Sequence, residues 1–207
     1  GAFVGVYFIY LMQLANTSLN PQLLLILSLI VAGVFGALLS LLHAFAAINL
    51  KADQTISGTA INMLAPGLGL FLAKLIFNGN SSVPFSNTFR IHEIPVLSQI
   101  PILGPILFKG AYITTYLGII ILILSVIFLN KTRAGLRLRA CGENPQAADA
   151  AGVSVYKYRY IGVLLSGFLG GMGGLIYIIP ISTVFNSDVG GYGFLALAIL
   201  IFGNWQP

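Results

Sequence analysis

Charged side chains are scarce in this chain, and their scarcity excludes a soluble fold. Only 7% of the 207 residues are Asp, Glu, Lys or Arg, whereas a soluble domain carries about 25%. Hydrophobic residues make up 57% of the sequence, and the mean hydropathy is +0.95. The chain is therefore predicted to be an all-α membrane protein, a polytopic bundle of transmembrane helices that forms a single domain over residues 1–207.

Several kinds of chemistry also lack the residues that they require. The single cysteine, Cys141, cannot form an intrachain disulfide. The sequence contains no G-x-x-x-x-G-K-[S/T] loop, so the chain does not hydrolyse ATP by that route. No His, Cys and carboxylate residues have the spacing of a metal site. None of the five acidic residues falls centrally in a predicted span, which disfavours a proton-coupled transporter. We predict no metal site and no catalytic residue, and an intramembrane enzyme lacks the dyad that it needs.

Long apolar runs are what the sequence has in abundance, and four of them are long enough to cross a bilayer. These four are Leu23–Leu50, Thr55–Phe77, Ala111–Leu129 and Ile161–Ile181. The runs at the two ends, Gly1–Leu14 and Tyr192–Trp205, are shorter than the ~20 residues that a span needs. We interpret the chain as an internal fragment of a larger membrane protein, with a partial span at each end. Re-entrant or interfacial helices are the alternative for these two runs.

Polar and helix-breaking residues make the run Thr55–Phe77 the candidate for lining a solute pathway. Pro66 removes a backbone hydrogen bond and is expected to break the helix near its middle. Broken backbone at membrane depth is tolerated only against protein or a water-filled cavity. With a histidine from the preceding run, the candidate pathway residues are His43, Ser57, Gly58, Asn62 and Pro66. Ordinary polar packing between helices is the alternative for each of them.

Glycines in the run Ile161–Ile181 recur at a spacing that is typical of close helix packing. Gly167 with Gly171, and Gly170 with Gly174, each form a small-xxx-small pair. We predict that these four glycines form a packing face. A face that leaves room for a solute is the alternative.

Six of the ten basic residues lie in the stretch 131–159, between two apolar runs. Asn144 suits a helix N-cap, Pro145 suits the first helical position, and Gly152 suits the left-handed residue that ends a helix. The alanine-rich segment between them predicts a short helix with a smooth surface, which fits a partner's groove. The basic residues flank spans, so they indicate contact with membrane lipid and not with nucleic acid.

Orientation in the membrane follows from the same charges. Placing 131–159 in the cytoplasm also places Lys51 there, as the positive-inside rule favours. The connections Asn78–Gly110 and Ser182–Gly191 are then external. The first of these contains four prolines, and we expect its apolar pieces to lie at the membrane surface.

At the residues Gly142-Glu143-Asn144-Pro145-x-Ala147-Ala148-x-x-Ala151-Gly152 the chain resembles the permease subunits of ABC importers of the ribose, branched-chain amino acid and nucleoside group. The segments LRACGENPQAADAAGVSVYKYRY, LLSGFLGGMGGLIY and QTISGTAINMLAPGL are similar to the nucleoside or simple-sugar branch.

The resemblance implies a permease, without its own catalysis, in the plasma or inner membrane. It implies that 131–159 is a cytoplasmic coupling loop whose short helix contacts a separate ATPase subunit. The implied contact residues are Glu143, Asn144, Pro145, Ala147, Ala148, Ala151 and Gly152. ATP and Mg would bind that subunit and not this chain. Further implied partners are a second permease subunit and an external lipoprotein that binds the solute. A secondary transporter or channel for a small polar solute is the alternative function.

Overall fold

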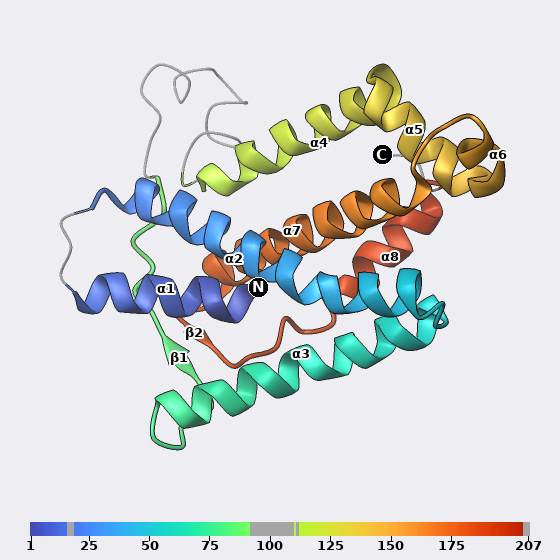
Figure 1. Cartoon of the computed structure of the whole chain (residues 1–207). Coiled ribbons are helices and arrows are strands. Elements are labelled where there is room, and N and C mark those ends of the chain that lie inside the picture. Colours follow the sequence, from blue (N-terminus) through green and yellow to red (C-terminus); the bar gives the residue numbers. More distant parts are fainter. Residues whose placement is uncertain (16–18, 92–109, 111, 205–207) are drawn as a thin grey trace, which may run out of the picture.

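The computed structural model describes residues 1–15, 19–91, 110 and 112–204, and these form a bundle of helices with one two-stranded sheet (Figure 1). The helices are α1 (Ala2–Leu14), α2 (Pro21–Ala44), the π-helical turn η1 (Phe45–Asn49), α3 (Gln54–Ile76), α4 (Ile113–Lys131), α5 (Arg133–Glu143), α6 (Pro145–Ala150), α7 (Val155–Ile181) and α8 (Tyr192–Phe202). The strands are β1 (Val83–Pro84) and β2 (Val184–Phe185).

The prediction of an all-α membrane protein is confirmed. Four helices are long and apolar enough to cross a membrane: Pro21–Asn49, Gln54–Ile76, Ile113–Lys131 and Val155–Ile181. They correspond to the four apolar runs found in the sequence. α1 and α8 are apolar but shorter.

The packed core lies where α2 and α7 cross, with α1 against both of them. Small residues let the backbones approach closely, as membrane helix packing requires. A methyl group added at Gly36 would lie 2.8 Å from the Cα atom of Gly171. Leu25, Leu29, Leu175 and Ile179 are fully buried beside this contact. The centre of the bundle is therefore a closely packed three-helix unit.

The helices α3, α4 and α8 are covered much less by the rest of the chain. Only Gly69 and Ala73 are buried on α3, only Thr114 is buried on α4, and no residue is buried on α8. Their large apolar side chains face outward, as they do where lipid or another membrane subunit surrounds a helix.

The two connections that were predicted to be external meet at one end of the bundle, here called the strand end. β1 and β2 pair there in antiparallel fashion, with Val83 opposite Phe185. Gln13 fixes the same region, since its side chain donates to the carbonyl of Ser86 and accepts from its N–H, both at 2.9 Å. Phe89 is fully buried. The apolar pieces that were expected at the membrane surface lie outside the described residues.

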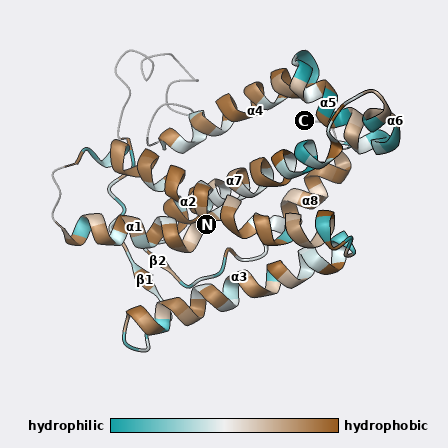
Figure 2. Cartoon of the chain, viewed as in Figure 1, coloured by the Kyte–Doolittle hydropathy of each residue, from teal (hydrophilic) through white to brown (hydrophobic). Residues whose placement is uncertain are grey.

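Hydrophilic residues gather at the opposite end, here called the basic end, which holds α5 and α6 (Figure 2). Asn49 of η1 donates to the hydroxyl of Tyr156 at 2.9 Å and accepts from Tyr160. These bonds join the end of α2 to the start of α7, so Lys51 lies at the same end as the basic stretch, as alternation of the spans predicts.

Three elements differ from the sequence prediction. α3 was expected to break at Pro66, but it runs from Gln54 to Ile76 without interruption. The reason is that a proline removes one N–H, and the other hydrogen bonds of the helix remain. α7 begins at Val155, six residues before the predicted span. α5 was not predicted at all.

Candidate functional site

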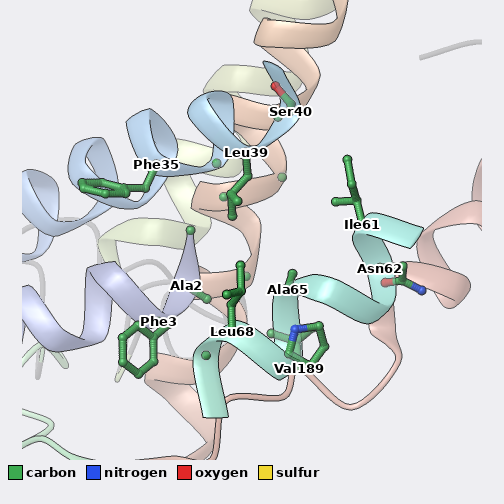
Figure 3. A pocket seen from close by; sticks show the side chains of 18 of the residues that line it. Ala2, Phe3, Phe35, Leu39, Ser40, Ile61, Asn62, Ala65, Leu68 and Val189 are labelled. Carbon is green, nitrogen blue, oxygen red and sulfur yellow. The ribbon is translucent and has the colours of Figure 1, made fainter. Parts of the chain in front are cut away.

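A cavity of about 600 Å³ lies between α2, α3 and α7, and it is the main candidate site. Figure 3 shows Phe35, Leu39 and Ser40 of α2 on one side, with Ile61, Asn62, Ala65 and Leu68 of α3 facing them. The start of α1 and the residues Ser187, Asp188 and Val189 complete the wall. Most of the wall is apolar, and polar groups stand at a few separate points, as in many small-molecule sites.

Four of the five predicted pathway residues line this cavity: His43, Gly58, Asn62 and Pro66. Ser57 does not line it but holds His43 in place, because its Oγ atom lies 3.0 Å from His43 Nδ1. This hydrogen bond joins the last turn of α2 to the first turn of α3. The five residues are thus brought together, and His43 is positioned by a partner on the facing helix.

Asn62 and Pro66 provide the polar groups that α3 presents to the cavity. Pro66 has no N–H to donate to the carbonyl of Asn62, which is four residues before it in the helix. The Asn62 side chain is exposed and has no hydrogen-bond partner within the described residues. The Asn62 carbonyl, which lacks its usual donor four residues on, and the Asn62 side-chain amide therefore lie at the same place on the cavity wall. They can accept from and donate to a polar solute.

The predicted glycine face of α7 both packs against neighbouring helices and lines the cavity. Gly167 and Gly171 pack on α2, against Ser40, Gly36 and Ala32. Gly174 lies near Ala2 of α1, where an added methyl group would approach to 3.1 Å. The packing prediction does not hold for Gly170, which is exposed and has nothing within 4 Å of an added methyl group. Gly170 lines the cavity, and it leaves that side of α7 flat.

The cavity residues of the connection that follows α7 carry no clear signal in the sequence. Ser187 and Asp188 lie in a polar turn between spans, and such turns are normally solvated. Phe3 and Phe35 also line the cavity, but an aromatic residue in an apolar span carries no signal that separates it from packing. Within the described residues, no group of three or more His, Cys, Asp or Glu side chains could hold a metal ion.

The second candidate site is the short helix α6 at the basic end. Its start follows the predicted chemistry: the Asn144 side chain accepts from the N–H of Ala147 at 3.0 Å, and Pro145 takes the first position. Its end does too, because Gly152 has φ +78°. The Gly152 N–H donates to the carbonyl of Asp149 at 2.9 Å. The helix is therefore a closed and well-capped unit of six residues.

Only part of the predicted alanine surface is available to a partner. Glu143, Ala147 and Ala151 are exposed and Pro145 is half-buried, but Ala148 is only 5% exposed. Ala148 faces its own chain, which corrects its assignment to the contact surface. The reason is geometric, since consecutive residues of a helix point about 100° apart and two neighbours do not share one face.

The unpredicted helix α5 connects α6 to two spans. The Thr132 hydroxyl caps its start by accepting from the N–H of Gly135 at 3.0 Å. Gly135 lies against the backbone of Phe128 and Leu129 in α4, where a methyl group would clash. On the other side, Arg137 donates to the Tyr158 hydroxyl of α7 at 3.3 Å, and this bond raises the pKa of Arg137 above its usual value. A displacement of α6 would therefore reach α4 and α7 together.

Comparison with known proteins also points to a membrane permease. The family described as the permease component of the branched-chain amino acid transport system matches residues 1–207. The chain is 44% identical to the nucleoside ABC transporter permease protein NupC of Lactococcus lactis subsp. cremoris, over 100% of this chain and 64% of that protein. It is 50% identical to the guanosine ABC transporter permease protein NupQ of Bacillus subtilis, over 87% of this chain and 57% of that protein.

A third relative has a different named solute. The chain is 32% identical to the putative glucose ABC transporter permease protein TsgC13 of Haloferax volcanii, over 83% of this chain and 52% of that protein. The chain thus spans less than two thirds of the length of these relatives. No solved structure matches it.

Proposed function

The chain belongs to the family of branched-chain amino acid transport permease components, and we propose that it is the membrane-spanning subunit of an ABC importer that carries nucleosides into the cytoplasm. Permease components bind and move a solute but perform no chemistry on it. The observation that carries the proposal is the mostly apolar cavity with a few polar groups between α2, α3 and α7, in a chain whose relatives include permeases named for nucleosides and guanosine.

The composition of the cavity wall supports a neutral solute with one flat apolar part and one polar part. Its volume of about 600 Å³ lies within the usual range of about 300–1,000 Å³ for small-molecule sites. The flat side of α7 at Gly170, together with Phe3 and Phe35, suits a planar base. The wall residues of the described chain include no Lys or Arg, so a phosphorylated solute would lack a counter-charge. A nucleoside meets these conditions, and a simple sugar meets only the polar ones.

The partners follow from the architecture of such importers. A separate ATPase subunit, which binds ATP and Mg, would receive α6 in a groove and contact Ala147, Ala151 and Gly152. A second permease subunit would cover the exposed apolar faces of α3 and α8. An external lipoprotein would deliver the solute at the strand end. The exposed residues of α6 and the outward-facing apolar side chains support these assignments.

Uptake by the assembled transporter tests the proposal. The full-length permease and its partner subunits are reconstituted in vesicles, and uptake of labelled guanosine and uridine is measured with and without ATP. We expect ATP-dependent uptake that unlabelled nucleosides inhibit and that ribose and glucose leave unchanged. An assembly whose ATPase cannot hydrolyse ATP is the control. Equal inhibition by ribose would favour a sugar permease, and uptake that needs no ATP would favour a secondary transporter.

A further inference from the structure

Ser187 is the one cavity residue whose placement the packing of the chain does not explain. It lies in the connection between α7 and α8, and it has φ +62°, in the left-handed region that non-glycine residues rarely adopt. It is 7% exposed, and its hydroxyl oxygen is buried with no hydrogen-bond partner within the described part of the chain. Both features are unfavourable in a folded protein. A glycine at this position would avoid both, so the fold alone does not require a serine.

Hydrogen bonds on both sides of Ser187 fix the conformation of the connection and therefore the position of this residue. The Ser182 hydroxyl donates to the carbonyl of Val184 at 2.6 Å and accepts from its N–H at 3.1 Å. β2 then pairs with β1, and Phe185 is buried. After Ser187, the Asp188 carboxylate accepts from the N–H of Gly190 at 3.1 Å. Ser187 is therefore fixed between two hydrogen-bonded turns, on the wall of the cavity.

The helix α3 lies against the Ser187 side chain. A methyl group added at Gly69 of α3 would lie 3.1 Å from the Ser187 Cβ atom and 3.4 Å from its Oγ atom. α3 is also lightly held by the rest of the chain, since Gly69 and Ala73 are its only buried residues. A small shift of α3 would uncover the hydroxyl toward the cavity. A solute that bonds this hydroxyl would then favour the shifted position of α3.

We propose that Ser187 is a solute-contacting residue whose hydroxyl bonds a sugar hydroxyl of the nucleoside when α3 moves away from the connection. The inference rests on the proposed function and names one specificity-determining contact within it. A serine hydroxyl both donates and accepts, and the carboxylate of the adjacent Asp188, which also lines the cavity, accepts. Together they match neighbouring hydroxyls of a ribose ring. The base would lie farther along the cavity, toward Asn62 and the flat side of α7.

The test compares Ser187→Ala and Ser187→Gly in the complete, reconstituted transporter. Both variants remove the hydroxyl, and the glycine also suits the left-handed backbone, so Ser187→Gly keeps the test available if the alanine variant is unstable. Ser28→Ala is the matched control, because Ser28 is also buried but its hydroxyl donates to the carbonyl of Leu25 at 2.7 Å. Uptake of uridine, 2′-deoxyuridine and 3′-deoxyuridine is measured for each protein.

For both Ser187 variants we expect the KM for uridine to rise about 2–10-fold, the effect of one lost hydrogen bond. We also expect the preference for uridine over one deoxy analogue to disappear, and Ser28→Ala to keep it. An unchanged KM together with an unchanged preference overturns this inference and leaves the proposed function in place. A wild-type assembly that takes up no nucleoside contradicts the proposed function first, and the inference with it.

Discussion

Gly170 and Gly171 are neighbours in the sequence and both border the cavity, but only Gly171 also packs against α2. Gly171 is buried in the α2–α7 contact, where an added methyl group would meet the carbonyl oxygen of Ala32. Gly170 faces the cavity and has nothing within 4 Å of an added methyl group. The spacing of the glycines predicted that a packing face exists. It could not separate the face that packs from the face beside it, because both show the same four-residue repeat.

Substituting the two glycines separately tests this difference. Gly171→Ala forces the methyl group into the backbone of α2, and we expect it to destabilise the permease by about 1–3 kcal/mol, as overpacking does. Gly170→Ala meets no neighbour and removes an unfavourable helical glycine, so we expect no loss and a gain of up to about 0.5–1 kcal/mol. Thermal unfolding in the same detergent measures both. Equal destabilisation by the two variants would contradict the assignment of the faces.

At the scale of the element, α6 combines predicted and unpredicted features. Its cap at Asn144, its first position at Pro145 and its end at Gly152 are local chemistry, so the nine residues 144–152 were enough to predict them. The burial of Ala148 depends on how α5 and α7 approach, and no local pattern carries that information. α5 itself was missed because its four arginine and glutamate side chains (Arg133, Arg137, Arg139 and Glu143) break the long apolar runs that identified the spans. By pattern alone, the basic stretch therefore indicates a loop anchored at the membrane.

The same substitution at two adjacent alanines separates the coupling surface from its support. Ala147 is exposed, so Ala147→Leu should leave thermal stability unchanged while it obstructs the ATPase groove and lowers ATP-driven uptake about 10-fold, equivalent to 1.4 kcal/mol of lost contact energy. Ala148→Leu places three extra carbon atoms in a buried site and should lower stability by about 1–3 kcal/mol.

Stability, co-purification of the ATPase subunit and uptake are measured for both alanine variants. Full uptake by a stable Ala147→Leu protein would count against α6 as the coupling helix. A stable Ala148→Leu protein would show that this residue is not confined by its own chain.

At the scale of the whole molecule, seven of the ten basic residues and the two strands lie at opposite ends of the bundle. Lys51 and the exposed basic residues of 131–159 lie at the basic end, and β1 with β2 lies at the strand end. The number and the order of the spans could be predicted from hydropathy, because each span must satisfy its backbone internally over a fixed thickness. The pairing of β1 with β2 joins residues about a hundred positions apart. It could not be predicted, because neither two-residue strand has a pattern of its own.

Selective labelling of single cysteines tests the orientation that this polarity predicts. The native Cys141 is 3% exposed, so the unchanged chain should react little with a membrane-impermeant maleimide. Asn80→Cys adds an exposed thiol at the strand end, and Gln146→Cys adds one on α6. In intact cells we expect Asn80→Cys to label and Gln146→Cys to label only after the membrane is permeabilised, since positively charged loops are retained in the cytoplasm. Labelling of Gln146→Cys from outside would place α6 beyond the reach of an ATPase, and both the coupling role and the import function would then be wrong.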